Sequence, residues 1–149
     1  MEDTTNIALM SQFVDAIITA RQSIKSFIQP RIKEAYGHEI SYEMFQVLNV
    51  LWRKNEVNQQ EIANTVQKGK ASLTPLIDNL VKIKLVTRTE DAADRRNKII
   101  ALTAEGKLYK QKFDPMLNEF YTLYKGNLSD EKIQELTALL LNVSHNVSK

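Results

Sequence analysis

The chain has 149 residues, enough for one domain with its own hydrophobic core, and its 43% apolar and 26% charged content is ordinary for a globular protein. It contains no cysteine, which excludes disulfide bonds, thiolate catalysis and redox sensing by cysteine. The net charge is only +2, but residues 68–98 carry eight basic and four acidic side chains, so the positive charge is concentrated in one segment.

The first predicted element is a long amphipathic helix from Ile7 to Ile32. Pro30 is expected to kink or loosen its last turn, and Gly37 marks the break that follows. The apolar positions of this helix repeat at the spacing of a single helical face and are Met10, Phe13, Ile17, Ile24, Phe27, Ile28 and Ile32.

Two shorter helices are predicted next. Ser41 is a good N-cap for the first, with Glu43 in its opening turn. Asn58 and Glu61 have capping-box spacing at the start of the second, which we expect to end at Gly69. Their inward-facing positions are Phe45, Leu48, Leu51 and Trp52 in the first helix and Ile62, Ala63 and Val66 in the second.

A fourth helix and a hairpin follow. The helix covers residues 70–84, with Pro75 about one turn in, and its apolar face comprises Leu73, Leu76, Ile77 and Leu80. Residues 86–89 are predicted to form one strand, and a short alternating apolar strand is predicted to follow a basic turn at Asp94–Lys98. A helix-turn-helix followed by such a hairpin is typical of a winged helix.

The C-terminal third is predicted to form two more helices. The first runs from Thr103 to Tyr124, with a bend expected at Pro115, and Ser129 caps the second. Their apolar stripes, like that of the first helix, either pack within one chain or bury against a second copy. We therefore predict a mainly α fold with a small β-hairpin wing, a winged helix-turn-helix flanked by long N- and C-terminal helices.

Five segments together carry a resemblance to a known family: Gln60–Ala63, Ser72–Leu80, Leu85–Arg88, Asp94–Arg96 and Leu102–Gly106. The chain resembles the MarR family of bacterial transcription regulators over nearly its whole length. The resemblance implies one domain, 1–149, with a winged helix-turn-helix DNA-binding lobe at 38–102 and a helical dimerisation lobe at 5–36 and 103–149. It also implies a homodimeric regulator, a repressor, that binds an inverted-repeat operator in double-stranded DNA.

Two positions depart from the family pattern. The Ser72–Ile77 run looks most like the branch of organic-peroxide sensors, but the reactive cysteine of those sensors is absent, so their chemistry does not carry over. Lys84 stands where the family often places a glycine at the helix end, and its charge can face the negative end of the helix dipole.

The predicted DNA contacts lie on the outer face of the fourth helix and on the wing. Ser72 and Thr74 suit base edges or phosphates, and the resemblance places a minor-groove arginine at Arg96, with Asp94 fixing a guanidinium or capping the turn. Asp78 is expected to pair with a basic neighbour or to lie where the helix leaves the groove. The full candidate set is Lys68, Lys70, Ala71, Ser72, Thr74, Pro75, Asn79, Arg88, Arg95, Arg96 and Lys98.

Other readings remain open. In one, the outer face of the fourth helix and the Asp94–Lys98 turn are ordinary solvated surface without a binding role. In another, the chain is a winged-helix protein-interaction module or a non-specific DNA-binding protein without ligand response. No enzyme, cofactor or metal site is expected, because His38 and His145 lack ligand spacing and no glycine-rich phosphate loop is present. Without a signal peptide or membrane span we expect a cytoplasmic protein with no membrane partner.

A small aromatic or lipophilic effector is a further expectation from the resemblance. It would bind near the junction of the dimer helices and the winged helix, where five ring-bearing side chains gather in the sequence: Tyr36, His38, Tyr42, Phe45 and Trp52. These side chains either line such a pocket or belong to the hydrophobic core.

Overall fold

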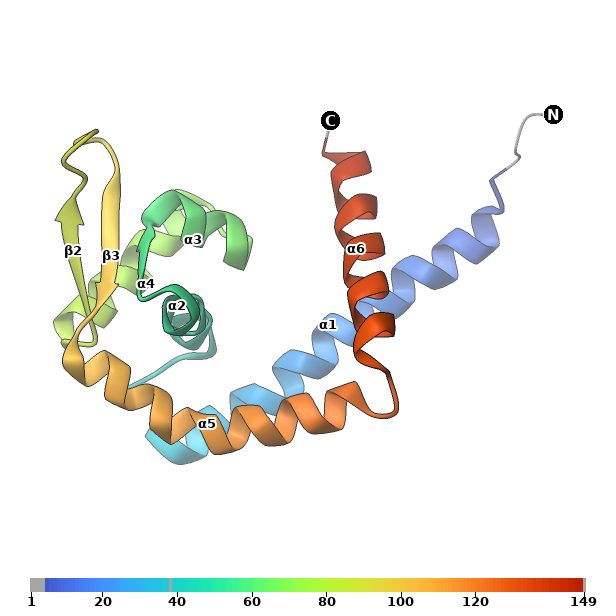
Figure 1. The fold of residues 1–149 in the computed structure, drawn as a ribbon, viewed down its shortest axis with the longest axis horizontal. Coiled ribbons are helices and arrows are strands. Elements are labelled where there is room, and N and C mark those ends of the chain that lie inside the picture. The colour runs from blue at the N-terminus through green and yellow to red at the C-terminus, as the bar shows by residue number, and fades with distance from the viewer. Residues whose placement is uncertain (1–4, 38, 149) are drawn as a thin grey trace. The chain divides into compact units, whose positions relative to one another are not determined.

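A computed structural model of the chain describes residues 5–37 and 39–148, so His38 lies outside the described residues. Within these ranges it has six helices and one three-stranded sheet, which confirms the predicted mainly α fold with a hairpin (Figure 1). The elements are α1 (Ile7–Tyr36), α2 (Tyr42–Lys54), β1 (Glu56–Asn58), α3 (Gln59–Val66), α4 (Lys70–Lys82), β2 (Val86–Glu90), β3 (Lys98–Leu102), α5 (Ala104–Lys125) and α6 (Asp130–Val147).

The chain divides into two compact units inside α5, one ending at Asp114 and the other beginning at Pro115. The bend expected at Pro115 stays a prediction. No helix in the described part of the chain is long and apolar enough to cross a membrane.

The predicted caps at both serines are confirmed. The Oγ of Ser41 accepts the Met44 backbone N–H at 3.1 Å, and the Oγ of Ser129 accepts that of Lys132 at 3.2 Å. Thr103 caps α5 in the same way, through a 3.0 Å bond from the Gly106 N–H. Each cap satisfies one of the backbone donors that a helix start leaves without a partner.

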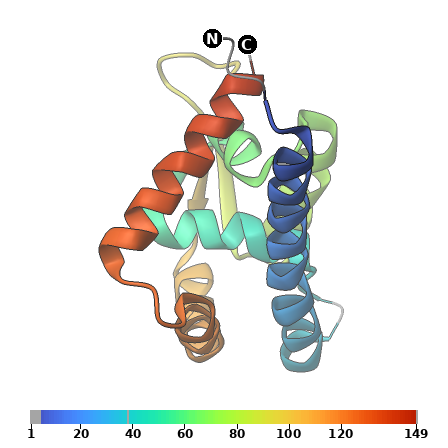
Figure 2. The same cartoon turned by 90° about the vertical axis from the view of Figure 1, so that its right-hand side faces the viewer.

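Helix α1 is longer than its sequence pattern indicated. It continues through Pro30 to Tyr36 as one helix (Figure 2), and Gly37 ends it with a positive φ of 61° and an N–H bond to the Lys33 carbonyl. The expectation that Pro30 lies in the last turn is therefore wrong, because the helix continues past it to Tyr36. The burial of Ile28 and Ile32, on either side of the proline, holds this part of the helix in place although proline cannot donate a backbone hydrogen bond.

The end of α3 also corrects the sequence analysis. Gly69 does not end this helix but is the N-cap of α4. The stop comes at Gln67, a non-glycine residue in the left-handed conformation, whose side-chain amide donates to the Asn64 carbonyl at 2.7 Å. At the helix start, Asn58 caps Gln60 rather than Glu61, and Glu61 instead forms an ion pair with Lys54 of α2.

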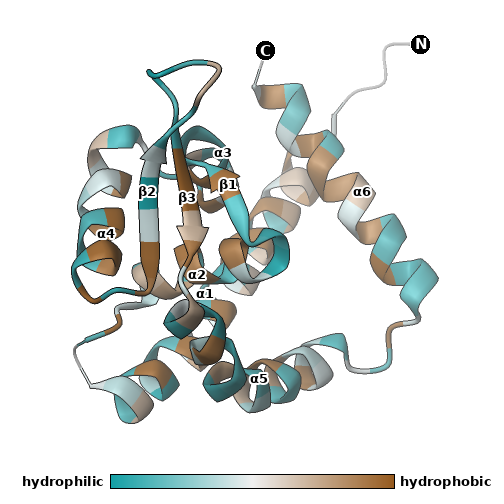
Figure 3. Cartoon of the chain, turned by 60° about the vertical axis from the view of Figure 1, so that its left-hand side comes forward, coloured by the Kyte–Doolittle hydropathy of each residue, from teal (hydrophilic) through white to brown (hydrophobic). Residues whose placement is uncertain are grey.

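The sheet contains one strand that the sequence analysis missed. Its order is β1-β3-β2, all antiparallel, with the apolar β3 between its two neighbours (Figure 3). Ile100 at the centre of β3 faces Val57 of β1 and Arg88 of β2, and it is fully buried. A strand of three residues is too short to show an alternating pattern, which is why β1 escaped prediction.

The core of the first unit is built around α2. Seven of its 13 residues are buried, and an aromatic cluster joins this helix to the end of α1 and the start of α5. Phe113 of α5 lies 4.6 Å from Tyr36, 5.3 Å from Phe45 and 5.2 Å from Trp52, measured between ring centroids. The interpretation of Phe45 and Trp52 as core residues is thus confirmed.

The second unit has a different character. Helix α6 contains no buried residue, and hydrophobic residues recur along its length (Figure 3). The large apolar side chains of this unit with at least 40% of their surface exposed are Tyr121, Leu123, Tyr124, Leu128, Leu136, Leu139, Leu140, Leu141 and Val147.

The end of α4 explains the unusual residue at position 84. The helix ends at Lys82, two residues earlier than predicted, and Lys84 has a φ of 64°, the left-handed conformation that favours glycine. Its carbonyl accepts a 2.7 Å bond from the Thr103 hydroxyl, and the following N–H of Leu85 bonds to the Leu80 carbonyl. These bonds hold a lysine in a conformation that its Cβ disfavours.

We expect Lys84→Gly to raise the free energy of unfolding by about 1 kcal/mol, because glycine removes the left-handed strain but adds freedom to the unfolded chain. Urea denaturation at fixed protein concentration measures the change. The matched control is Lys82→Gly, within α4, which should lower stability by about 1 kcal/mol. Equal losses in both variants would contradict the strain at position 84.

Candidate nucleic-acid interface

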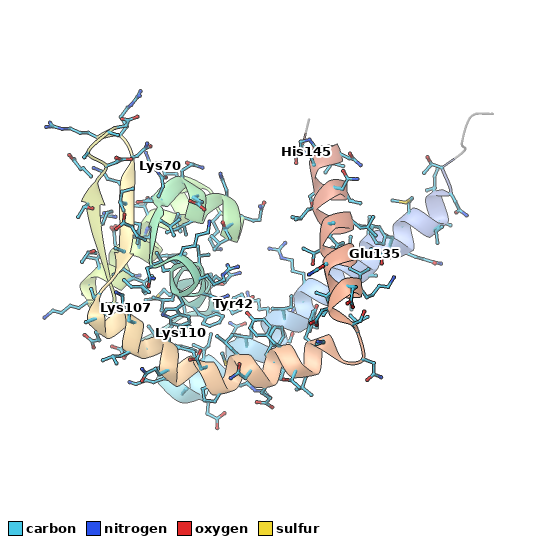
Figure 4. The ribbon with its side chains drawn as sticks, in the orientation of Figure 1. Tyr42, Lys70, Lys107, Lys110, Glu135 and His145 are labelled. Carbon is cyan, nitrogen blue, oxygen red and sulfur yellow. The ribbon has the colours of Figure 1, made fainter. Side chains whose placement is uncertain are left out.

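The outer face of α4 is available for contact. Leu73, Ile77 and Leu80 are fully buried on the inner face, as predicted, whereas Leu76 is half-buried. On the outer face, the exposed side chains include five of the predicted site residues: Lys70, Ala71, Ser72, Pro75 and Asn79. Lys70 lies at the start of the helix, on the side of the wing tip (Figure 4).

Thr74 has a different environment from the rest of this face. It is half-buried, its hydroxyl donates to the Lys70 carbonyl at 2.9 Å, and it accepts a 3.3 Å bond from the side-chain amide of Gln59. The hydroxyl hydrogen is therefore already used within the protein. Thr74 links the two helices of the helix-turn-helix in addition to facing outward.

A groove of about 440 Å³ lies between α3, the start of α4 and the wing. It brings together five predicted residues: Lys70, Thr74, Arg88, Arg96 and Lys98. Sequence reasoning missed its polar wall at the start of α3, formed by Asn58, Gln59 and Gln60. The capping signal at Asn58 would have located these residues, because the N-terminus of a helix is itself attractive to anions.

At the wing, Asp94 fixes Arg96 in the way the sequence suggested. Its carboxylate accepts the Arg96 backbone N–H at 3.0 Å and two guanidinium bonds, each of 3.1 Å. The side-chain bonds from Arg96, followed by the backbone bond, lower the pKa of Asp94. The Arg96 side chain is nevertheless 91% exposed, and Arg95 beside it is exposed as well.

Two further cations of the groove are paired with acids. Arg88 Nη1 lies 2.7 Å from Asp78 Oδ1 on α4, so the expectation that Asp78 pairs with a basic neighbour is confirmed. Lys98 Nζ lies 3.0 Å from Glu90 Oε1, its register partner across the hairpin. The groove is therefore lined by cations whose geometry is set by neighbouring acids.

Lys68 lies apart from this groove. It lines a second cavity, of about 500 Å³, between α1, α2 and the end of α3. Of the ring-bearing residues considered for an effector pocket, Tyr42 lines this cavity (Figure 4), whereas Tyr36, Phe45 and Trp52 do not. Burial, followed by the charge of Glu43, raises the pKa of Tyr42.

Comparison with known proteins agrees with this architecture. The sequence model of the MarR family matches residues 40–98. The homoprotocatechuate degradative operon repressor of Escherichia coli is 25% identical over 125 residues, which are 84% of this chain and 82% of the repressor. Residues 40–98 of the chain form a winged helix of the MarR type.

Solved structures of MarR-type fold match nearly the whole chain. The structure of AbfR of Staphylococcus epidermidis has a TM-score of 0.79 and 21% sequence identity, covering 96% of each chain. NadR in complex with 4-hydroxyphenylacetate has a TM-score of 0.76 and 24% identity, covering 96% of this chain and 95% of NadR. AbfR has also been solved bound to DNA.

In this chain we expect the Asp94 carboxyl to titrate below the usual aspartate value of about 3.9. Because its pKa is lowered in the folded state, the bonds to Arg96 are complete above that usual value and are lost as the pH falls through the lowered one. Carboxyl carbon chemical shifts from an NMR pH titration measure this. Arg96→Gln should return the pKa partly toward 3.9, and an Asp94 that titrates normally in the parent would contradict the assignment.

Proposed function

We propose that this protein is a homodimeric, sequence-specific DNA-binding repressor of the cytoplasm, released from its operator by a small-molecule effector, and that it is not an enzyme. One observation carries the proposal: the cationic groove between α4 and the wing lies next to the exposed polar face of α4. Positive charge provides affinity for phosphates, and a helix face of small polar residues can approach base edges.

The proposed contacts divide between two grooves of the duplex. The first turns of α4 enter the major groove, where Ser72 and Asn79 meet base edges and Pro75 contacts a thymine methyl group. Lys70 reaches the backbone. Arg96 enters the minor groove already oriented by Asp94, which reduces the entropy that binding costs.

The exposed apolar surface supports the dimer. In α1, large apolar side chains are exposed throughout the N-terminal half: Ile7, Leu9, Met10, Phe13, Val14 and Ile18. Together with the exposed apolar side chains of the second unit, this surface is more than a soluble monomer usually leaves uncovered. We assign dimerisation to residues 5–36 and 103–149 and DNA binding to residues 38–102, so a two-fold dimer reads an inverted repeat.

Salt dependence tests the DNA proposal. A dimer that neutralises about 6–10 phosphates should lose affinity with a log–log slope of about −5 to −9 in salt concentration. The DNA for this measurement is a duplex recovered by in vitro selection from random sequences. If no duplex binds in a salt-sensitive way, the proposal fails and the alternative of a protein-interaction module gains support.

Arg96→Ala should weaken binding to the selected duplex by about tenfold or more, because one oriented guanidinium is lost from each protomer. Fluorescence anisotropy measures the affinity, and sedimentation should show an unchanged dimer. Lys132→Ala, which removes an exposed, acid-paired cation from α6, is the control and should bind like the parent. Unchanged affinity in Arg96→Ala would contradict the wing assignment.

The second cavity supports the effector part of the proposal. The ring of Tyr42 and the apolar side chains of Ile18, Ile24 and Val66 line it, and Arg21 adds a cation. Lys25, also in the lining, lies 3.6 Å from Glu43 and 5.5 Å from the centroid of the Tyr42 ring. An aromatic carboxylate, the chemical class of the ligand in the NadR structure, suits such walls.

We expect aromatic carboxylates to release the selected duplex, and Arg21→Gln to raise the concentration required by about tenfold while leaving DNA affinity in the absence of effector unchanged. Titration of the carboxylates into the labelled complex measures this. Lys33→Gln, which changes a cation of α1 outside the cavity lining, should respond like the parent. Identical release curves for Arg21→Gln and the parent would contradict this site.

A further inference from the structure

An acid on the DNA-facing helix needs an explanation. Asp78 lies in α4 with 52% of its side chain exposed, and it is the single acid of that helix. A carboxylate near the phosphates of DNA would repel them and weaken binding to any duplex. Its 2.7 Å contact with Arg88 offers a different role.

The position of Arg88 makes that contact possible. Side chains alternate along a strand, so Arg88 shares a face of β2 with Val86, which is 2% exposed. The strand packs against α4, and Arg88 therefore extends from the wing toward the helix. Only 33% of its side chain is exposed, and it lines the groove beside Lys70 and Thr74.

The geometry of the pair leaves most of the guanidinium available. A guanidinium carries five N–H donors in a rigid plane, and Arg88 approaches Asp78 through its Nη1. The remaining donors can face the groove. A long, flexible side chain held in this way loses less freedom when it meets a phosphate than an untethered one does.

We propose that Asp78 is a positioning residue for DNA recognition: it holds Arg88 in the groove between α4 and the wing, so that one guanidinium contacts the DNA backbone while tying the helix to the wing. This inference rests on the proposed DNA-binding function. Under this inference the Asp78 carboxylate favours operator binding, although its negative charge alone would oppose binding.

The two roles of Asp78 predict opposite results for Asp78→Asn. If the acid only repels phosphates, its removal strengthens binding to every duplex. If it positions Arg88, its removal weakens binding to the selected duplex about threefold per protomer, and so about tenfold for the dimer, and it also weakens binding to a scrambled duplex because a backbone contact does not depend on sequence. Loss of one phosphate contact in each protomer should also make the salt slope shallower by about 2.

The experiment uses the full-length dimer with the selected duplex and a scrambled one. Asp78→Asn is compared with Asp78→Glu, which should recover part of the affinity, and with Arg88→Gln. In the Arg88→Gln background, Asp78→Asn should cause no further loss. Glu61→Gln, which removes an exposed paired acid from α3 away from the groove lining, is the matched control and should not weaken binding.

The outcomes separate this inference from the function on which it rests. If the parent binds no duplex in a salt-sensitive way, both fail. If the parent binds its selected duplex and Asp78→Asn binds it equally or more tightly, the positioning role is overturned and the DNA proposal stands. A loss of binding together with a lowered unfolding midpoint would also overturn it, because Asp78 would then act on the fold.

Discussion

The base of the wing is fixed by a set of hydrogen bonds around Thr103, where the two ends of the hairpin meet. The Thr103 hydroxyl donates to the Lys84 carbonyl, its N–H donates to the Leu85 carbonyl at 3.1 Å, and the same hydroxyl caps α5. Gly106 packs so closely here that a Cβ would collide with the Leu85 carbonyl oxygen. The direction of the wing, the end of α4 and the start of α5 all depend on this junction.

Structural features that depend on residues close together in the chain could be predicted from the sequence. The caps at Ser41 and Ser129, the buried stripes of α2 and α4 and the hairpin follow from local hydrogen bonding and from the period of the apolar residues. The paired roles of Asp94 and Arg96 were also predictable, because the two residues are close in sequence.

Features that depend on contacts between distant segments were not readable in this way. The left-handed lysine at position 84 is held by Thr103, and β1 exists because Ile99–Ala101 provides its partner. The polar wall of the groove and the bond from Gln59 to the Thr74 hydroxyl likewise require the packing of α3 on α4. Lys68 is a further feature that the sequence could not predict, because it is close to Lys70 in sequence but lines a different cavity.

The junction at the wing base also contains the only tryptophan of the chain. Trp52 is 8% exposed, its indole N–H donates to the Gly106 carbonyl at 3.0 Å, and its ring packs against Phe113. Indole emission is sensitive to the polarity and hydrogen bonding around the ring. The protein thus contains a native fluorophore at the point where α2, α5 and the wing meet, and label-free spectroscopy can follow that point during ligand and DNA titrations.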